Sequence, residues 1–485
     1  MPEIPQFFFT IWPHVIALAD LTLVAVSVSH VVLTKPDTRS AIGWVGIILL
    51  APFVGTILYV LFGVNRIHRT ARRLKRGVAG PGRAEIQPAT SKAISRTLGE
   101  EASHLLPLME FVKQITDLPL LDGNRITPLV GGDEAYADML AAIDKAQCSI
   151  GLSTYIFDND PVGALFVDAL DRAQQRGVEV RILIDDVGSR YTLPPITWTL
   201  RRRGLPHAKF LPTLIPWKLH YSNLRSHRKI LVIDGDIGFT GGMNIRQGHR
   251  LSDPGKHPIQ DIHFRIEGPV VAHLRETFAS DWEFCTGERL TGENWFQQLE
   301  PRGFTLCRGI PDGPEAQMEQ LQYTLQCAID CARKSIVVVT PYFLPEQALI
   351  TALTVAAMRG VQVQIVLPEK NNLTMVQWAC MGQLGQVLER GCRVWLSSPP
   401  FDHSKLVIVD GCWVLLGSAN WDPRSLRLNF EFNVECYDRE LAQAATQVAH
   451  EKMHSGRELQ LAELQNRPLI WRIRDGIARL AQPYL

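Results

Sequence analysis

The sequence lacks several features that would assign it at once to a class of protein. It has no low-complexity tract, and its formal net charge is only +1, with 50 basic and 49 acidic residues. A net charge near zero argues against a general nucleic-acid binder, although a local basic groove is still possible. Its nine cysteines include no CxxC pair. An odd number of scattered cysteines predicts reduced thiols, and therefore a soluble part that faces the cytoplasm.

A metal-binding motif is also missing. His249, His257, Asp261 and His263 are close in sequence, but their spacing matches no metal-ligand pattern. We therefore expect no metal and no other cofactor, and a metal cluster at these four residues is the alternative.

Two long apolar runs lie near the N-terminus. Residues 15–33 contain one charged side chain, Asp20, and residues 41–64 contain none. About 20 apolar residues are enough for a helix to cross a bilayer. A cleaved signal peptide fits poorly, because the N-terminus has no basic segment and a second apolar run follows at once. The sequence predicts a two-helix transmembrane hairpin over residues 1–65.

A basic segment follows the second apolar run and sets the predicted orientation. Residues 66–76 hold six basic side chains and no acidic one, whereas the connector at 35–39 holds two basic side chains and one acidic side chain. Basic residues mark the cytoplasmic side of membrane helices. We therefore expect residues 66–125, a basic juxtamembrane linker with helices, and the chain after it to lie in the cytoplasm. The basic residues are Arg66, Arg69, Arg72, Arg73, Lys75 and Arg76.

The C-terminal residues 457–485 are predicted to form an amphipathic helix. Apolar residues recur at helical spacing from Leu469 to Leu480, with arginines between them and Trp471 beside them. This pattern is typical of a helix in the membrane interface, and equally of a helix docked on the protein core.

The rest of the chain contains an internal repeat. The apolar, β-rich run at 149–157 is matched about 186 residues later by the run at 335–343. A helical stretch follows each run, ends in Arg-Gly-Val and leads into a second apolar run. Strand, helix and strand in this order are typical of parallel strands covered by helices. We predict two similar α/β halves, at residues 126–300 and 301–456.

Each half carries one polar signature with the same internal spacing. Counted from the histidine, a lysine lies two residues later, an aspartate seven, a glycine fourteen and an asparagine seventeen. Chance agreement would not reproduce four spacings twice. The first copy consists of His227, Lys229, Asp234, Gly241 and Asn244, and the second of His403, Lys405, Asp410, Gly417 and Asn420.

The apolar residues inside each signature indicate its local geometry. Residues 229–233 and 405–409 are predicted strands, and residues two apart on a strand point to the same face. The histidine and the lysine of each copy should therefore project together. The Asp-Gly pair after each strand favours a tight turn. The next strand should return beside the first and bring the asparagine close to the lysine.

A cluster of histidine, lysine and asparagine suits an oxyanion. Two such clusters from pseudo-symmetric halves can form one pocket with two imidazoles, two ammonium groups and two amides. Positive groups neutralise the oxygens of a phosphodiester, and they do so more strongly in a dry site. One imidazole can attack phosphorus while the other protonates the leaving alcohol, and the roles then reverse. The sequence thus predicts phosphodiester chemistry that needs no metal.

These residues resemble the phospholipase D superfamily, whose signature is two copies of HxKxxxxD, each followed by Gly-Gly or Gly-Ser and Asn. Within it the chain is most similar to the bacterial cardiolipin synthases. The likeness covers nearly the whole chain, from Trp44, Pro52 and Tyr59 in the apolar N-terminus to the segment Asn429-Phe430-Glu431. The implied fold is α/β, with two pseudo-symmetric phospholipase D-like halves that share one active site, preceded by two transmembrane helices.

The resemblance also implies a role for each matched residue. The catalytic set, in which the two aspartates act through turns or salt bridges, is His227, Lys229, Asp234, His403, Lys405 and Asp410. The residues implied to bind the substrate phosphate are Asn244, Ser418 and Asn420. Ser418 stands where the first copy has Gly242, so one half would offer a hydroxyl and the other only a backbone amide.

Two carboxylates are implied to orient the histidines. Glu431 follows Asn420 by eleven residues, whereas Asp261 follows Asn244 by seventeen, so Asp261 departs from the second copy's spacing. The two signatures are too alike to reveal which histidine is the nucleophile. The resemblance favours His227, with His403 as acid and base.

The implied activity is phosphatidyl transfer between two phosphatidylglycerol molecules through a phosphohistidine, with release of glycerol. The expected partners are phospholipids and the bilayer rather than nucleic acid. The expected location is the bacterial inner membrane, with the catalytic part in the cytoplasm.

Several alternatives stay open. A hydrolytic phospholipase D that yields phosphatidic acid differs only in what reaches the phosphohistidine. A nuclease of the same superfamily and a non-catalytic membrane scaffold are the others. Phosphatidylethanolamine is an alternative donor, and the sequence does not indicate the oligomeric state.

Overall fold

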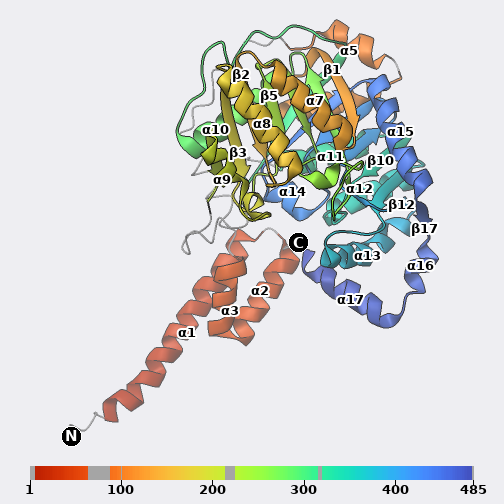
Figure 1. Ribbon diagram of the computed structural model, residues 1–485. Helices are drawn as coiled ribbons and strands as arrows, with labels where there is room; N and C mark the ends of the chain where they lie inside the picture. The colour runs from red at the N-terminus through yellow and green to blue at the C-terminus, as the bar shows by residue number, and fades with distance from the viewer. Residues whose placement is uncertain are drawn as a thin grey trace. The chain divides into compact units, whose positions relative to one another are not determined.

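The structure, a computed structural model, divides into two compact units, Met1–Thr70 and Ala71–Leu485 (Figure 1). The residues that it describes are 6–35, 37–63, 88–99, 101–212, 224–314 and 319–482. The predicted basic run at 66–76 lies outside the described residues.

The N-terminal unit is helical. Helix α1, Gln6–Thr34, contains the segment Ile11–Thr34, which is long and apolar enough to cross a membrane. It is the one such helix in the described part of the chain. The second apolar run instead forms α2, Thr38–Leu50, and α3, Pro52–Leu58, followed by a π-helical turn at Tyr59–Gly63.

The prediction that the second apolar run forms one membrane helix is therefore wrong, and Pro52 explains the break between α2 and α3. Proline has no backbone N–H, and its ring excludes the helical conformation from the residue before it. Ala51 accordingly has φ −142° and ψ 73°. The helices of this unit still pack on one another, around the buried side chains of Val31, Ile48 and Tyr59.

The second unit is built on one sheet of fifteen strands, and the repeat predicted from the sequence determines its order. The first half runs β1-β8-β6-β5-β2-β3-β4, and the second runs β9-β16-β15-β14-β10-β11-β12 and ends on β17. The halves meet where β1 pairs with β9, through Leu121–Cys307 and Asn124–Thr305. Corresponding strands therefore lie at corresponding distances from this seam.

The strands of the first half are β1 (Leu121–Val130), β2 (Ser149–Thr154), β3 (Glu179–Asp185), β4 (His207–Phe210), β5 (Ile230–Ile233), β6 (Ile237–Gly241) and β8 (Ile262–Glu267). Those of the second half are β9 (Thr305–Asp312), β10 (Ser335–Val339), β11 (Gln362–Pro368), β12 (Arg393–Ser397), β14 (Leu406–Val409), β15 (Trp413–Gly417), β16 (Glu431–Tyr437) and β17 (Arg457–Leu459). A separate short pair joins β7 (Ile259–Gln260) to β13 (Phe401–Asp402).

The βαβ prediction holds in both halves. Strands β2 and β3 are parallel with α8, Pro161–Gln175, between them, and β10 and β11 are parallel with α12, Gln347–Met358, between them. The signature strands β5 and β14 then run antiparallel to their neighbours. The first half begins with β1 at Leu121, five residues before the predicted boundary at 126.

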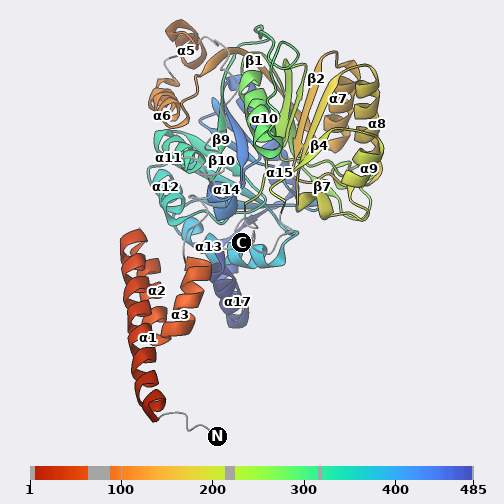
Figure 2. The ribbon, with the colours of Figure 1, turned by 90° about the vertical axis from the view of Figure 1, so that its left-hand side faces the viewer.

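Helices cover both faces of the sheet (Figures 1 and 2). Because side chains alternate along a strand, Ile150 and Leu152 of β2 face the core formed with α7 (Gly132–Lys145) and α8. Gly151 between them faces the other side, where Phe278 of α10 (Val271–Thr286) leaves no room for a Cβ. The remaining helices are α9 (Ile196–Arg202), α11 (Gln320–Cys331), α13 (Thr374–Leu388), α14 (Pro423–Arg427), α15 (Arg439–Ser455), α16 (Leu461–Gln465) and α17 (Leu469–Leu480).

The described part of the predicted linker is not a separate region. Helices α5, Ser91–Leu98, and α6, Leu106–Thr116, follow residue 88. Leu105, Leu108 and Val112 are fully buried in the core of the second half. Residues 91–116 therefore belong to the body of the sheet unit.

Candidate active site

A pocket of about 220 Å³ lies where the two halves meet, at the ends of the signature strands. Both predicted histidines and both predicted asparagines line it. The polar lining is Tyr155, Tyr191, Arg225, His227, Asn244, Arg246 and His249 from the first half, and Tyr342, Asn372, His403, Asn420, Asp422, Arg424 and Asn429 from the second. Side chains of both signatures therefore line one pocket.

Backbone pairing between the halves brings each histidine to the other half's carboxylate. The His227 N–H donates to the Phe430 carbonyl at 2.9 Å, and the His403 N–H donates to the Gln260 carbonyl at 2.8 Å. Phe430 and Gln260 each precede an orienting carboxylate by one residue. The segment before each signature strand therefore runs beside the start of the other half's carboxylate strand.

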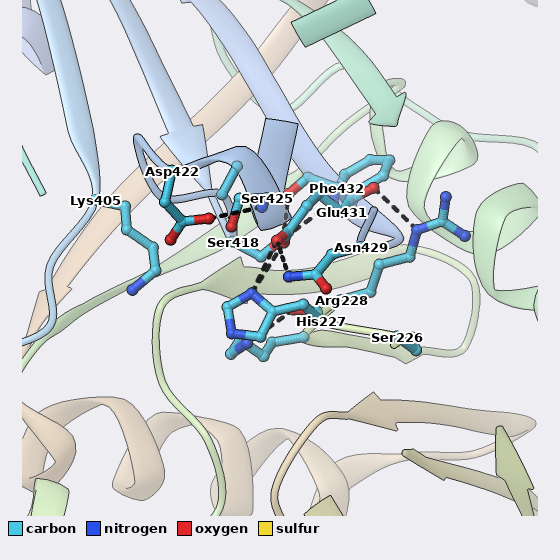
Figure 3. Close-up of polar contacts among 12 residues, drawn as sticks. Ser226, His227, Arg228, Lys405, Ser418, Asp422, Ser425, Asn429, Glu431 and Phe432 are labelled. Atoms are coloured by element: carbon cyan, nitrogen blue, oxygen red, sulfur yellow. Dashed lines mark hydrogen bonds and ion pairs between the residues drawn. The ribbon is translucent and has the colours of Figure 1, made fainter. Parts of the chain in front are cut away.

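The His227 imidazole is held by Glu431 of the second half (Figure 3). Its Nδ1 lies 3.0 Å from both carboxylate oxygens. The Ser418 hydroxyl donates to the same carboxylate, as does the Asn429 amide at 3.3 Å. Although burial alone would raise it, the neighbouring His227 and Lys229 hold the pKa of Glu431 below its ordinary value. An ionised Glu431 accepts a hydrogen bond from the Nδ1–H group, so the other ring nitrogen, Nε2, keeps its lone pair.

The His403 imidazole is held by Asp261 of the first half. Its Nδ1 lies 2.8 Å from Asp261 Oδ2 and also 3.1 Å from the Lys405 ammonium nitrogen. Burial raises the pKa of Asp261 above its ordinary value, against the charge of Lys405. The Nδ1 of His403 thus has both an acceptor and a donor within reach, so either ring nitrogen can carry the proton.

Each histidine contacts the carboxylate of the other half, which we call crossed carboxylates. Sequence spacing alone did not predict this exchange. The unequal distances of the carboxylates from the asparagines have a simple origin in strand register. Gly241 pairs with His263, and Gly417 pairs with Asn433. Asp261 and Glu431 each lie two residues before those partners and are therefore equivalent positions. The additional six residues of the first copy fall in the loop after Asn244, which contains the short 3₁₀ turn Gln247–His249.

Ser418 does not occupy the position that the resemblance implied for it. Its side chain is fully buried, does not line the pocket and donates its hydroxyl to Glu431 rather than facing a phosphate. The equivalent Gly242 has no room for a side chain, because a Cβ there would lie 2.2 Å from Asp261 Oδ1. The pairs Ser418–Glu431 and Gly242–Asp261 are thus two ways to fill the same space behind a histidine.

Both signature lysines are buried beside their histidines. The Lys229 ammonium donates to the His227 carbonyl at 2.7 Å, and the Lys405 ammonium donates to the His403 carbonyl. Burial lowers the pKa of Lys229 to about 7 and that of Lys405 to about 8. Because a bound phosphate would supply the missing negative charge, both lysines are poised to gain protons when an anion enters.

Burial favours the neutral form of both histidines. It lowers the pKa of His227, aided by Lys229 and opposed by Glu431. Burial, and after it the charges of Lys405 and Lys229, lower the pKa of His403 well below its ordinary value. An arriving anion would offset these nearby cations and raise the pKa of His403 again.

The signature aspartates lie away from the pocket, at the turns after β5 and β14. Asp234 accepts from the backbone N–H groups of Gln147, Cys148 and Ser149, at 2.7–3.1 Å. Asp410 accepts from Arg333, Lys334 and Ser335 in the same way, and also contacts His104 at 2.7 Å. Each aspartate ties its turn to the start of a neighbouring strand, which agrees with the structural role that the resemblance implied and separates them from the catalytic set.

The two asparagines end on the pocket wall. The Asn244 Oδ1 accepts from the Ile156 N–H at 3.1 Å, which leaves its amide nitrogen toward the pocket side. The Asn420 Oδ1 is buried without a hydrogen-bond partner in the structure. Each asparagine follows the positive-φ glycine that ends β6 or β15, Gly241 and Gly417. Any side chain there would collide with the neighbouring strand.

The alternative metal cluster does not assemble. No group of three or more His, Cys, Asp or Glu side chains within the described ranges is arranged to hold a metal ion. His257 is exposed on a loop. His249 is buried on the pocket wall, with its Nδ1 4.0 Å from Asp261 Oδ2 and both ring nitrogens without hydrogen bonds. It lies 6.4 Å from the His403 ring, between centroids.

Sequence reasoning missed several pocket residues. The Tyr155 ring meets His227 edge-on at 5.2 Å between centroids, and Tyr342 meets His403 similarly at 6.4 Å. Arg225, Arg246 and Arg424 add three guanidinium groups. These arginines could have been identified from their closeness in sequence to the signature residues. Arg225 lies two residues before His227, and Arg246 and Arg424 closely follow the two asparagines.

Comparisons with known proteins agree with this site. The family model described as "Cardiolipin synthase, PLD-like domain" matches residues 139–282 and 325–453, and so covers one signature with each segment. A second model, "Phospholipase_D-nuclease N-terminal", matches residues 22–63.

Curated relatives span almost the full chain. "Cardiolipin synthase" of Geobacillus thermodenitrificans (strain NG80-2) is 31% identical over 448 residues, 92% of this chain and 88% of that protein. "Major cardiolipin synthase ClsA" of Bacillus subtilis (strain 168) is 29% identical, over 93% of this chain and 95% of the relative.

Among solved structures, the phosphatidylserine synthase of Haemophilus influenzae Rd KW20 matches with a TM-score of 0.61 at 16% identity. The match covers 78% of this chain and all of that one, and it supports the fold alone. Together with the family model, the long relatives show that this chain belongs to the cardiolipin synthase family, within the phospholipase D-like proteins.

Proposed function

We propose that the chain joins two phosphatidylglycerol molecules into cardiolipin and releases glycerol, with a phosphohistidine on His227 as the intermediate. Membership of the cardiolipin synthase family makes the chain a phosphatidyltransferase. The observation that carries the two-histidine mechanism is the pair of crossed contacts, His227 with Glu431 and His403 with Asp261, at one pocket.

In the first step, the His227 Nε2 lone pair attacks phosphorus of the first lipid. The lipid phosphate raises the pKa of His403, which takes up a proton as the lipid binds. The bond between phosphorus and the glycerol headgroup oxygen then breaks, and that oxygen takes the additional proton from the His403 imidazolium, which becomes neutral. The product is a phosphatidyl group on His227 and free glycerol. Asn244 and Asn420, which line the pocket, would face the phosphoryl oxygens. Lys229 and Lys405, buried directly behind the histidines, would stabilise the developing charge with their positive charge.

In the second step, a headgroup hydroxyl of a second phosphatidylglycerol gives its proton to His403 and attacks the phosphohistidine. The bond between phosphorus and His227 breaks, and the enzyme returns to its starting state. No proton or electron is left over in the cycle, which therefore needs no co-reactant.

The environments of the histidines favour this division of roles. The His227 Nδ1 faces an ionised carboxylate with both oxygens, which fixes its tautomer and leaves Nε2 as a nucleophile. The His403 Nδ1 has Asp261 and Lys405 as neighbours, so its proton can move between ring nitrogens. A group that must give a proton in one step and accept it in the next benefits from this freedom.

The direct test uses the full chain in detergent with excess chelator and with phosphatidylglycerol labelled in both the headgroup and the acyl chains. Cardiolipin and free glycerol are expected, because the proposed charges all come from side chains. Phosphatidic acid without cardiolipin would mean hydrolysis by the same pocket. Turnover that stops with chelator and returns with a divalent ion would contradict the metal-free mechanism.

We further propose that α2 and α3 form a second, broken passage through the inner membrane, with the catalytic unit in the cytoplasm. The apolar side chains of Leu49, Leu50 and Phe53, on both sides of the break, are exposed. A cysteine placed at Asp37 should react with an impermeant thiol reagent added to intact cells, while the nine native cysteines should stay unlabelled. Labelling that requires cell lysis would contradict this topology.

A further inference from the structure

Helix α17 presents an apolar stripe that stays exposed among the described residues of its own unit. Five aliphatic side chains and one indole on this helix are between 49% and 77% exposed. At 100° per residue the aliphatic side chains fall within one narrow sector of the helix. They are Leu469, Ile470, Ile473, Ile477 and Leu480, and the indole is Trp471.

The opposite side of α17 is docked, which fixes where the stripe points. Asp475 and Ala478 are each 3% exposed and pack toward α13. The helices approach so closely that a Cβ on Gly382 of α13 would lie 2.8 Å from the Asp475 carbonyl. Asp475 is paired with Arg467 at 2.7 Å and with Arg474 at 2.8 Å. The sequence predicted either a helix in the membrane interface or a helix docked on the protein core. One face of α17 is docked on the core, and its apolar face points outward.

We propose that this stripe lies in the headgroup region of an anionic bilayer and holds the mouth of the active-site pocket against the lipid surface. Amphipathic helices with aliphatic and Trp side chains on one face and arginines beside it bind such interfaces. Arg472 and Arg479 flank the stripe and are exposed. Their charges suit phosphate headgroups.

The position of α17 connects the stripe to the pocket. Helix α13 lies beside α17 (Figures 1 and 2). Two residues at the start of α13, Leu373 and Val376, line the pocket. Gln482, just after α17, donates to the Leu344 carbonyl at 2.8 Å, and Leu344 is also part of the pocket wall. Helix α17 is thus joined to the pocket wall in two ways, through α13 and through Gln482.

The pocket mouth itself carries exposed apolar side chains on both sides. Leu373 and Met375, at the start of α13, are 49% and 47% exposed. Tyr191, on the first half's side of the pocket, is 54% exposed, and Leu193 beyond it is 88% exposed. A lipid whose headgroup reaches the histidines would leave its acyl chains beside these side chains, so a membrane fits this rim better than a soluble partner.

A photoreactive phenylalanine analogue at Ile473, in the full chain reconstituted into vesicles of phosphatidylcholine and phosphatidylglycerol, tests the contact directly. Irradiation is expected to give a lipid adduct at this position. The matched control is the same analogue at Phe304, which is 78% exposed and lies at the end of β9 remote from Glu431, and it should give no lipid adduct. An adduct only with a second copy of the chain, or none with lipid, would overturn the proposal. This readout needs no turnover and does not depend on the proposed reaction.

A kinetic test connects the contact with catalysis and rests on the proposed function. The double substitution Ile473→Asp and Ile477→Asp should lower turnover of long-chain phosphatidylglycerol in vesicles by about tenfold or more, since each buried carboxylate opposes interfacial binding. Turnover of a short-chain, monomeric phosphatidylglycerol should be unchanged. Equal loss on both substrates, or no loss on either, contradicts a membrane role, and Phe304→Asp should alter neither.

Discussion

The two half-sites of the pocket present almost the same groups to a substrate but differ in what stands behind their histidines. His227 is backed by Glu431, which Ser418 and Asn429 hold in place. His403 is backed by Asp261, with Lys405 beside its Nδ1 and with Gly242 in place of the serine. The difference teaches that a duplicated signature can supply two chemical roles while its motif residues stay identical. In the proposed mechanism, the two roles are set by these supporting side chains.

The largest effect is expected from the histidines themselves. His227→Ala and His403→Ala should each reduce cardiolipin formation by roughly 10³-fold or more. A phosphatidyl ester with an acidic leaving group, which needs no protonation, separates the two roles. His403→Ala should still release that leaving group and accumulate phosphohistidine, whereas His227→Ala should not. Accumulation in the His227 variant instead would exchange the two roles.

The crossed carboxylates should come next. Glu431→Gln and Asp261→Asn keep the shape but allow the wrong histidine tautomer, so each is expected to lower kcat by roughly 10²- to 10⁴-fold. With the acidic leaving group, the Glu431 variant should stay slow in phosphohistidine formation and the Asp261 variant should recover. Recovery by both variants, or by neither, would show that the two pairs do not have separate roles.

A smaller effect is expected where the two copies differ. Gly242→Ala places a Cβ against Asp261 and should lower kcat by about tenfold or more. Ser418→Gly removes one hydrogen bond to Glu431 and should lower kcat by about tenfold or less. Gly385→Ala on α13, where a Cβ meets no atom within 4 Å, is the matched control and should have no effect. A harmless Gly242→Ala would mean that Asp261 can move without cost.

The smallest effect is a dependence on pH that separates the lysines. Burial lowers the pKa of Lys229 to about 7 and that of Lys405 to about 8. Below these values both ammonium groups are present, and as pH rises through them the positive charge is lost, first from Lys229. KM for phosphatidylglycerol should therefore rise between about pH 7 and pH 9, because the phosphate loses its counter-charges. A KM that is flat across this range would contradict the low pKa values.

Much of the fold could be predicted because the repeat constrained it twice. The apolar runs at 149–157 and 335–343 begin where β2 and β10 begin, although both strands end earlier, and the predicted strands 229–233 and 405–409 contain β5 and β14. An apolar pattern that occurs in two copies at the same spacing leaves little freedom in the assignment of strands.

Other features depended on tertiary contacts that spacing does not encode. The exchange of Asp261 and Glu431 follows from the seam between halves, which brings together residues about 140 to 200 positions apart. His249 reaches the pocket wall because it lies in the loop after Asn244, which is six residues longer than its counterpart in the second copy. The break between α2 and α3 could have been predicted from Pro52. Counting apolar residues does not detect it, because the count ignores the effect of proline on helix geometry.

The exchange of carboxylates makes each half of the sheet unit an incomplete enzyme. Neither residues 121–300 nor residues 301–456 contain a histidine together with the carboxylate that holds it. The sheet unit is in this sense arranged like a dimer within one chain, with the pairing of β1 and β9 as the boundary between its halves. Genetic complementation follows from this arrangement. Consider two inactive full chains, one with a damaging substitution in its first half and the other with one in its second half. They could restore activity only by a domain swap that exchanges whole halves across that boundary.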